Sequence, residues 1–192
     1  MFRYCPSCAS QNIRFEENRK FRCPDCGFVY YHTTAAATGC IISVDKTIMF
    51  LVRAKEPALG KLDLPGGFVD PGEGALDGLR RECQEEIGWD PPGEFVLFAS
   101  FPNTYPYKNI TYHTCDLFFT IQAPGLKRED LRPDPEEIGD IRFIEPGLVD
   151  LNEVAFESTR RAVTAFLSYQ AGPQPPGNLP AGSGKTFGEL PR

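Results

Sequence analysis

The stretch that decides the fold runs from Gly67 to Trp89 and reads GFVDPGEGALDGLRRECQEEIGW. We predict a helix over residues 75–87, ended by the glycine at 88. On such a helix Glu82, Glu85 and Glu86 stand at i, i+3 and i+4 and share one face. Three carboxylates this close repel one another unless cations are present. The segment therefore predicts a Mg²⁺ or Mn²⁺ site, of the kind that usually also contacts substrate phosphates. The alternative interpretation is an acidic, solvated helix with a glycine cap.

Composition limits the classes of function. A chain of 192 residues accommodates one medium domain plus a small appendage. Its net charge of −6 argues against general nucleic-acid binding by phosphate neutralisation, although a divalent metal would still admit an anionic substrate. No stretch approaches the ~20 apolar residues that span a membrane, and the first residues lack the apolar core of a signal peptide. We therefore expect a cytoplasmic protein with no membrane partner and with reduced or metal-bound cysteines.

Two C-x2-C pairs stand near the N-terminus. Cys5 and Cys8 form the first pair, Cys23 and Cys26 form the second, and fourteen residues separate the pairs. Each pair presents two thiolates from a tight turn, and two such turns complete the four-sulfur site of a structural Zn²⁺. About 30 residues cannot fold by core burial alone, so metal binding would supply part of the folding free energy. We predict a zinc ribbon over residues 1–32, with a redox-active C-x-x-C as the alternative.

The rest of the chain predicts an α+β domain over residues 36–170, followed by a disordered tail over 171–192. The pattern indicates strands over 39–44, 47–52, 62–69, 94–101, 111–121 and 140–144. A second helix is expected over 152–169, with Phe166 and Tyr169 on its buried side. Cys40, Cys83 and Cys115 are expected to be buried as small apolar residues.

The segment from Gly67 to Trp89 resembles, at every fixed position, the 23-residue box of the Nudix hydrolases, G-x5-E-x7-R-E-U-x-E-E-x-G-U, in which U is a bulky apolar residue. Cys83 occupies the first U position and is the least typical residue of the match. The resemblance implies a Nudix α/β/α sandwich, a mixed sheet with the box helix, preceded here by the small zinc ribbon. A four-cysteine ribbon joined directly to such a domain is similar to the NADH pyrophosphatases.

The resemblance also implies roles for residues of the box. Glu82 and Glu86 would be metal ligands, and Glu85 would be a ligand or the general base. Arg81 would orient a glutamate rather than contact substrate. The metals would bridge a diphosphate and activate a water that attacks phosphorus. The backbone of Gly67 should lie close to the glutamates, because glycine permits conformations that a Cβ forbids.

Two further sites are expected outside the box. Glu137, just before the last predicted strand, is a candidate metal ligand; the alternative is a solvated loop acid. The stretch from Ser100 to Pro106 resembles part of the signature S-Q-P-W-P-F-P of the NADH pyrophosphatases, with Tyr105 in place of a phenylalanine, and we consider it together with Tyr107. We predict that this stretch is a loop at the substrate pocket, where Tyr105 and Tyr107 stack on a base or line the wall. For either tyrosine, packing in the core is the alternative.

These observations predict a metal-dependent pyrophosphohydrolase. Its substrate would be a small-molecule nucleotide, a nucleoside diphosphate linked to another moiety, of the NADH/NAD or ADP-ribose type. Removal of a nucleotide cap from RNA is a second interpretation. The net negative charge of the chain argues against it. A non-catalytic nucleotide-sensing module is a third, and the complete set of box carboxylates argues against it. The oligomeric state stays open, and a homodimer is one alternative.

Overall fold

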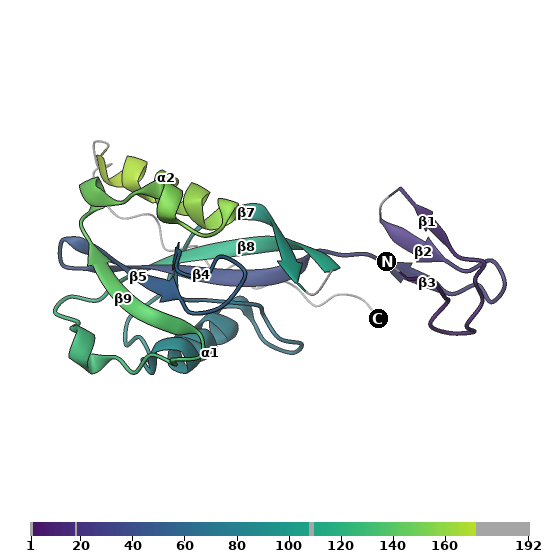
Figure 1. Ribbon diagram of the computed structural model, residues 1–192, viewed down its shortest axis with the longest axis horizontal. Helices are drawn as coiled ribbons and strands as arrows, with labels where there is room; N and C mark the ends of the chain where they lie inside the picture. Colours follow the sequence, from purple (N-terminus) through teal and green to yellow (C-terminus); the bar gives the residue numbers. More distant parts are fainter. Residues whose placement is uncertain (1, 18, 108–109, 172–192) are drawn as a thin grey trace, which may run out of the picture.

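The computed structural model describes residues 2–17, 19–107 and 110–171 (Figure 1). Its N-terminal ribbon is a three-stranded antiparallel sheet of β1 (Arg14–Glu16), β2 (Lys20–Arg22) and β3 (Val29–Tyr31), in the order β1-β2-β3. The ribbon stands at one end of the molecule, and the chain leaves it directly into a long strand of the main body. The strands agree with the predicted ribbon. Residues 172–192 of the predicted tail lie outside the described residues.

The main body is built on a six-stranded mixed sheet. Its strands are β4 (Ala35–Val44), β5 (Thr47–Arg53), β6 (Leu62–Asp63), β7 (Val96–Tyr107), β8 (Ile110–Gln122) and β9 (Ile138–Ile144). The order is β6-β5-β4-β8-β7, and β9 pairs with β5. Strands β4 and β8 are parallel, whereas every other pairing in this sheet is antiparallel. The connection between β4 and β8 includes the box segment, which brings the box helix onto the sheet.

One helix covers each face of this sheet (Figure 1). Helix α1 (Ala75–Ile87) buries Leu79 and Cys83 in a core that includes Ile42 of β4. Helix α2 (Glu157–Ala171) buries Val163 in a second core that includes Ile41. Successive residues of a strand point to opposite faces, so neighbouring positions of β4 serve the two cores. The predicted α/β/α sandwich is confirmed.

The box helix has the predicted bounds. Gly88 follows it with φ 62°, and its N–H donates to the carbonyl of Gln84 at 3.0 Å, as expected for a left-handed C-terminal cap. Three short 3-10 helices complete the described structure: η1 (Arg128–Asp130), η2 (Pro146–Leu148) and η3 (Leu151–Glu153).

The predicted loop over residues 100–107 is wrong, because β7 continues to Tyr107 in register with β8. Pro102 and Pro106 are compatible with a strand here because β7 lies at the edge of the sheet. A proline has no N–H for the ladder, and an edge strand can turn that position away from its neighbour.

Other local predictions also need correction. Helix α2 begins at Glu157, not at residue 152, and η3 precedes it. Tyr169 is 43% exposed, not buried. Cys115 is exposed, because alternation along β8 buries its neighbours Thr114 and Asp116 on the opposite face. Cys40 and Cys83 are buried as predicted.

Within the described residues, no helix has the length and the apolar run that crossing a membrane requires.

Candidate active site

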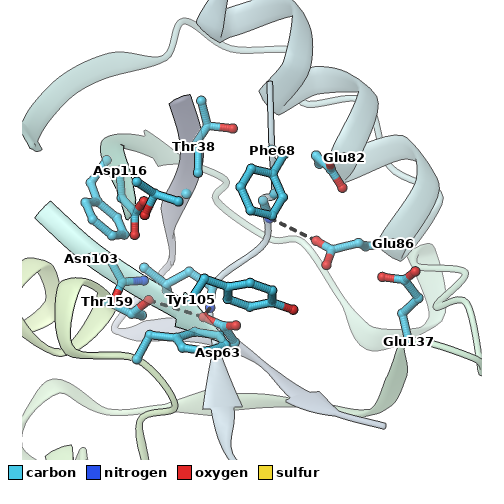
Figure 2. Close-up of a pocket in the computed structure, with 18 of the residues that line it drawn as sticks. Thr38, Asp63, Phe68, Glu82, Glu86, Asn103, Tyr105, Asp116, Glu137 and Thr159 are labelled. Atoms are coloured by element: carbon cyan, nitrogen blue, oxygen red, sulfur yellow. Dashed lines mark hydrogen bonds between the residues drawn. The ribbon is translucent and has the colours of Figure 1, made fainter. Parts of the chain in front are cut away.

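A cavity of about 360 Å³ opens at one end of the sheet, between the box helix and the start of α2 (Figure 2). Three kinds of side chain line it. Figure 2 shows three glutamates on one side, the rings of Phe68 and Tyr105 in the middle, and Asn103, Asp116 and Thr159 opposite the glutamates. The box glutamates Glu82, Glu85 and Glu86, together with Arg81, Gly67, Glu137 and Tyr105, all line this one cavity. Residues far apart in the chain therefore share one site.

The segment before α1 is held against β4 by backbone hydrogen bonds. The N–H of Thr38 donates to the carbonyl of Gly67 at 2.8 Å, and the N–H of Cys40 donates to the carbonyl of Pro65 at 2.9 Å. Gly66 has φ 143°, and a Cβ there would lie 2.1 Å from the carbonyl oxygen of Thr38. Its own N–H points the other way and donates to Oε2 of Glu86 at 2.9 Å. Only glycine fits this position.

Gly67 lies against a second box glutamate. A Cβ on Gly67 would stand 2.5 Å from Oε1 of Glu82, well inside van der Waals contact. The missing side chain therefore lets the carboxylate of Glu82 reach the loop backbone. The expected approach of Gly67 to the box glutamates is present.

Arg81 positions the acidic side of the cavity. Its Nε donates to Glu73 at 2.8 Å, and its Nη1 donates to Glu82 at 2.9 Å and to Glu85 at 2.8 Å. Its Nη2 donates to the carbonyl of Phe68 at 2.9 Å. The hydrogen bonds from Arg81 lower the pKa of Glu73. One guanidinium thus ties the loop, the start of the box and two helix glutamates together.

Burial makes the negative charge on two glutamates costly. Burial raises the pKa of Glu82, an effect that Arg81 opposes and that the nearby charges of Glu85 and Glu137 increase. Burial also raises the pKa of Glu86 well above its usual value, although the N–H of Gly66 favours the charged form. A cation between these carboxylates would remove this penalty. Glu85 differs, because its side chain is 60% exposed.

Glu137 reaches the same cavity from the turn before β9. Its carboxylate is paired with Lys55, and the N–H of Ala54 donates to its carbonyl at 2.7 Å. Figure 2 shows its side chain next to that of Glu86. Among the described residues, the only set of three or more metal-ligating side chains with ligand atoms within 4.8 Å of one another is a group of cysteines. The carboxylates line the cavity, but no three of those described have ligand atoms that all lie within 4.8 Å of one another.

The aromatic wall centres on Tyr105. Its ring centroid lies 5.7 Å from that of Phe68 and 5.6 Å from that of Phe156. The guanidinium of Arg53 sits over the ring of Phe156, 5.0 Å from its centroid. Tyr105 lines the cavity, whereas the side chain of Tyr107 lies outside the described residues. Sequence reasoning missed Phe68 and Phe156; the position of Phe68 directly after Gly67 was the available signal.

The polar end was also missed. Asn103, Thr114, Asp116 and Thr159 line the cavity. Figure 2 shows Asn103, Asp116 and Thr159 opposite the box glutamates. Thr114 and Asp116 alternate with exposed residues on β8 and precede the buried Phe118 on the same face. That alternation places two polar side chains where apolar ones would be expected, which was a signal in the sequence.

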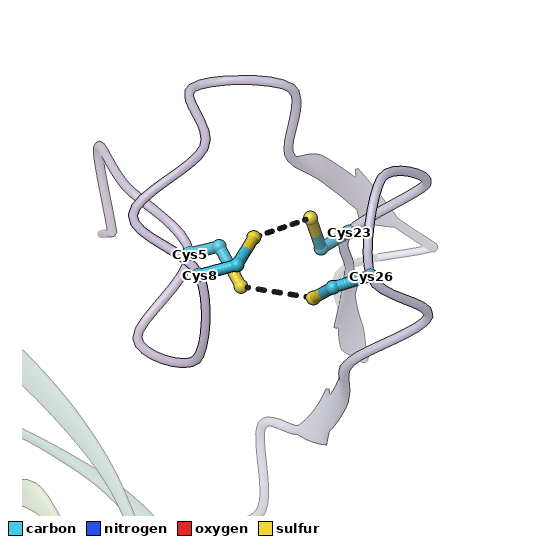
Figure 3. Close-up of side chains that lie close together, drawn as sticks. All are labelled: Cys5, Cys8, Cys23 and Cys26. Atoms are coloured by element: carbon cyan, nitrogen blue, oxygen red, sulfur yellow. Dashed lines mark hydrogen bonds between the residues drawn. The ribbon is translucent and has the colours of Figure 1, made fainter.

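The four cysteines of the N-terminal ribbon form a tight cluster (Figure 3). The Sγ atoms of Cys5 and Cys26 are 3.6 Å apart, and those of Cys8 and Cys23 are 3.7 Å apart. All four Sγ atoms lie within 4.8 Å of one another, and none forms a disulfide. A tetrahedral site with Zn–S bonds of about 2.3 Å needs sulfur atoms about 3.8 Å apart. The cluster fits a zinc ribbon.

Comparison with known families identifies the main body. A sequence model of the NUDIX domain matches residues 33–166. The chain belongs to the Nudix family. A NUDIX hydrolase from Nitrosomonas europaea has the same fold, with a TM-score of 0.62 and 21% sequence identity over 88% of this chain and 93% of that one. The NUDIX domain of Shewanella oneidensis NrtR, solved in complex with ADP ribose, has a TM-score of 0.57 and 17% identity over 71% of this chain and 88% of that one.

Two curated relatives are informative. The NAD-capped RNA hydrolase NudC of Chromobacterium violaceum is 28% identical over 173 residues, which are 88% of this chain and 61% of that protein. The ADP-ribose pyrophosphatase of Methanocaldococcus jannaschii is 40% identical over 113 residues, which are 59% of this chain and 61% of that protein. The chain thus spans about three-fifths of the length of these relatives.

Proposed function

We propose that this Nudix protein hydrolyses the diphosphate bond of a nucleoside diphosphate linked to another moiety, with Mg²⁺ or Mn²⁺ as cofactor. The observation that carries the proposal is the convergence of Glu82, Glu86 and Glu137 on one cavity beside an aromatic wall. Carboxylate oxygens are the ligands that these cations prefer, and such sites usually take substrate phosphates as well. The products would be two phosphate monoesters.

The carboxylates fit a hard divalent cation. Glu82 and Glu86 would hold it, with Glu137 as a further ligand. Their burial supports this assignment, because the pKa values of Glu82 and Glu86 stay raised by burial even though Arg81 and the N–H of Gly66 partly offset the negative charge. When bound, the cation would neutralise charge on the phosphates and lower the pKa of a coordinated water.

Other side chains would orient the reactants. Arg81 holds Glu82 and Glu85 in place through two hydrogen bonds from its Nη1. It would orient these glutamates rather than contact the substrate. Glu85 is exposed to the cavity and would be the general base or a ligand. Arg53 and Lys55 also line the cavity and supply positive charge for an anionic substrate.

The substrate class follows from the shape of the cavity and from the relatives. The aromatic wall around Tyr105 suits a base, and the glutamates suit a diphosphate. Relatives named for NAD-capped RNA and for ADP-ribose support substrates that carry an ADP-ribose unit. ADP-ribose and NADH or NAD⁺ are therefore the first substrates to test.

A hydrolysis screen tests the proposal. The panel holds NADH, NAD⁺, ADP-ribose, FAD, dinucleoside polyphosphates and nucleoside triphosphates, each with Mg²⁺ and with Mn²⁺. We expect the highest kcat/KM on one of the first three and no turnover in EDTA. Turnover of no compound in the panel, or equal turnover without a divalent ion, would refute the proposal.

Removal of a nucleotide cap from RNA is a second candidate. The relative named for NAD-capped RNA favours it, and so does the N-terminal ribbon. In residues 1–32 five Lys and Arg stand against three acids, and Tyr30 and Tyr31 are 44% and 62% exposed. Exposed aromatic rings among positive charges suit single-stranded RNA. RNA binding that weakens steeply with salt would support this activity; binding no tighter than that of the isolated cap nucleotide would argue against it.

The ribbon itself is assigned a structural role. Cys5, Cys8, Cys23 and Cys26 would bind one Zn²⁺, because their sulfur spacing matches a tetrahedral site. Residues 1–32 would form this metal-dependent unit, and residues 36–170 would form the catalytic domain. The catalytic domain has its own buried cores, so it should stay folded when zinc is removed.

A further inference from the structure

The polar end of the cavity contains buried polar atoms that form no hydrogen bond within the described part of the chain. Asp116 and Thr114 are 8% and 3% exposed. Oδ1 of Asp116 and Oγ1 of Thr114 have no hydrogen-bond partner among the described residues. Both residues line the cavity that holds the box glutamates. Buried polar groups are nearly always hydrogen-bonded, so these two atoms indicate that a ligand or water completes them.

Their positions are set by strand pairing. Thr114 and Asp116 are two residues apart on β8 and therefore point to the same face of the sheet. Asn103 stands directly opposite Thr114 on β7, so its side chain lies on that face too. The three side chains form a rigid polar floor, because every one of them comes from a paired strand.

A hydrogen bond to Oδ2 of Asp116 fixes the orientation of its carboxylate. Oγ of Ser158, a fully buried residue in the first turn of α2, donates to Oδ2 of Asp116 at 2.6 Å. This bond holds Oδ2 of Asp116 against the first turn of α2, and Oδ1 is the oxygen that has no partner among the described residues. The floor therefore offers one carboxylate oxygen and one hydroxyl without a partner among the described residues, together with the carboxamide of Asn103.

The neighbouring aromatic residues indicate what kind of ligand reaches this floor. Tyr105 lies two residues beyond Asn103 on the same face of β7, and Figure 2 shows it between the polar floor and the box glutamates. A flat ring that stacks on this wall would present its edge to the polar floor. Oδ1 of the Asp116 carboxylate can only accept, so the edge must carry an N–H donor for it. An acceptor beside that donor would pair with the hydroxyl of Thr114 or the NH₂ group of Asn103.

We propose that Asp116, with Thr114 and Asn103, selects a nucleobase whose edge pairs an exocyclic amine with an acceptor ring nitrogen, and that among purines with this Watson–Crick edge the ligand is adenine. The amine donates to Oδ1 of Asp116, and the ring nitrogen accepts from Thr114 or Asn103. Hypoxanthine has the same size and ring system but carries a carbonyl oxygen in place of the amine. That oxygen would face a carboxylate oxygen, and the two acceptors repel each other.

The proposal rests on the proposed function for its substrate class, but binding can be measured without turnover. The probes are 5′-AMP and 5′-IMP, which differ only at the base edge, titrated into the full chain with Mg²⁺ by calorimetry. A hydrogen bond to a charged group corresponds to about a ten- to hundredfold difference in affinity. We expect AMP to bind tighter than IMP by that factor. In the hydrolysis assay the same preference should appear in kcat/KM.

The variant Asp116→Asn tests the residue directly. Its carboxamide oxygen can still accept from Ser158, while its NH₂ group would face the cavity as a donor. AMP affinity should fall at least about tenfold, and the preference for AMP over IMP should disappear or reverse. Asp140→Asn is the control, because it makes the same change of charge at an exposed position of β9 and should leave both affinities unchanged.

The outcomes separate the two proposals. Equal affinities for AMP and IMP, no binding of AMP, or an Asp116→Asn variant that keeps the preference would each overturn the base-selection proposal. Each of these results would overturn it even if the protein hydrolyses compounds of the substrate panel. Failure of hydrolysis with a clear AMP preference would overturn the proposed activity and leave the base subsite standing.

Discussion

Gly67 and Glu82 are packed so closely that a side chain on Gly67 would displace the carboxylate. A Cβ built on Gly67 lies 2.5 Å from Oε1 and 2.6 Å from Cδ of Glu82. The contact joins the loop before the box helix to the face of the helix that carries the proposed metal ligands. The contact should affect activity more than stability, because the carboxylate of Glu82 can move without unfolding the protein.

Gly67→Ala should therefore affect turnover more than stability. We expect kcat to fall about tenfold or more, because Glu82 must shift away from the cavity, with a change in unfolding free energy of about 1 kcal/mol or less. Gly66→Ala is the contrasting variant. Its Cβ meets the backbone of Thr38 at 2.1 Å and its φ is 143°, so the free energy of unfolding should fall by at least about 2 kcal/mol. Thermal melts and kinetics on both variants test this; a Gly67→Ala enzyme with full turnover would contradict it.

Glu86→Gln should have opposite effects on activity and stability. Turnover should fall about a hundred- to a thousandfold, as when a group that stabilises transition-state charge is removed. The metal-free variant should melt higher than the metal-free wild type at pH 7. The pKa of Glu86 is raised in the folded protein, so the wild type loses stability as pH rises above the unfolded value of about 4.3. Glutamine has no such dependence. Melting curves in EDTA across pH measure the difference.

Glu82→Gln should likewise lower turnover by about two orders of magnitude. Its matched control is Glu94→Gln, which makes the same change at an exposed position outside the cavity. The control should keep full activity. Equal activity of wild type, Glu82→Gln and Glu86→Gln would remove the metal site from the box helix.

Tyr105→Ala should raise KM more than it lowers kcat. Stacking on an aromatic ring contributes about 1–3 kcal/mol, which corresponds to about five- to 150-fold in KM. Tyr112→Ala is the control, because Tyr112 also contacts the ring of Phe68, at 6.1 Å, but does not line the cavity. KM and melting temperature are measured on both variants. A large melting shift of Tyr105→Ala with an unchanged KM would place Tyr105 in a packing role instead.

The ribbon should contain one zinc per chain. Cys8→Ser should abolish stoichiometric zinc, while Cys115→Ser, at an exposed thiol outside the cluster, should retain it. Metal analysis of the purified proteins measures this. Chelation should unfold residues 1–32 and leave the melting transition of the main body in place, because the two cores of that body contain no residue of the ribbon. Zinc-free protein with an ordered ribbon would contradict the assignment.

The sequence by itself determined the box helix, its glycine cap and the cysteine ribbon, whereas the α/β/α class was implied by the resemblance of the box to the Nudix hydrolases. The first three features depend on local spacing: carboxylates at i, i+3 and i+4, a glycine after the last turn, and cysteine pairs on tight turns. Local spacing acts within a few residues, so it is visible without the fold.

Only the tertiary structure decided what surrounds those features. The pairing of β7 with β8 turned the expected loop over 100–107 into a strand and set Asn103 opposite Thr114. The start of α2 brought Phe156 against Tyr105 and Ser158 against Asp116. The contacts of Phe156 and Ser158 join residues more than forty positions apart, and no local pattern encodes them. Register and helix packing place them, because burial of two separate cores fixes how the strands and helices meet.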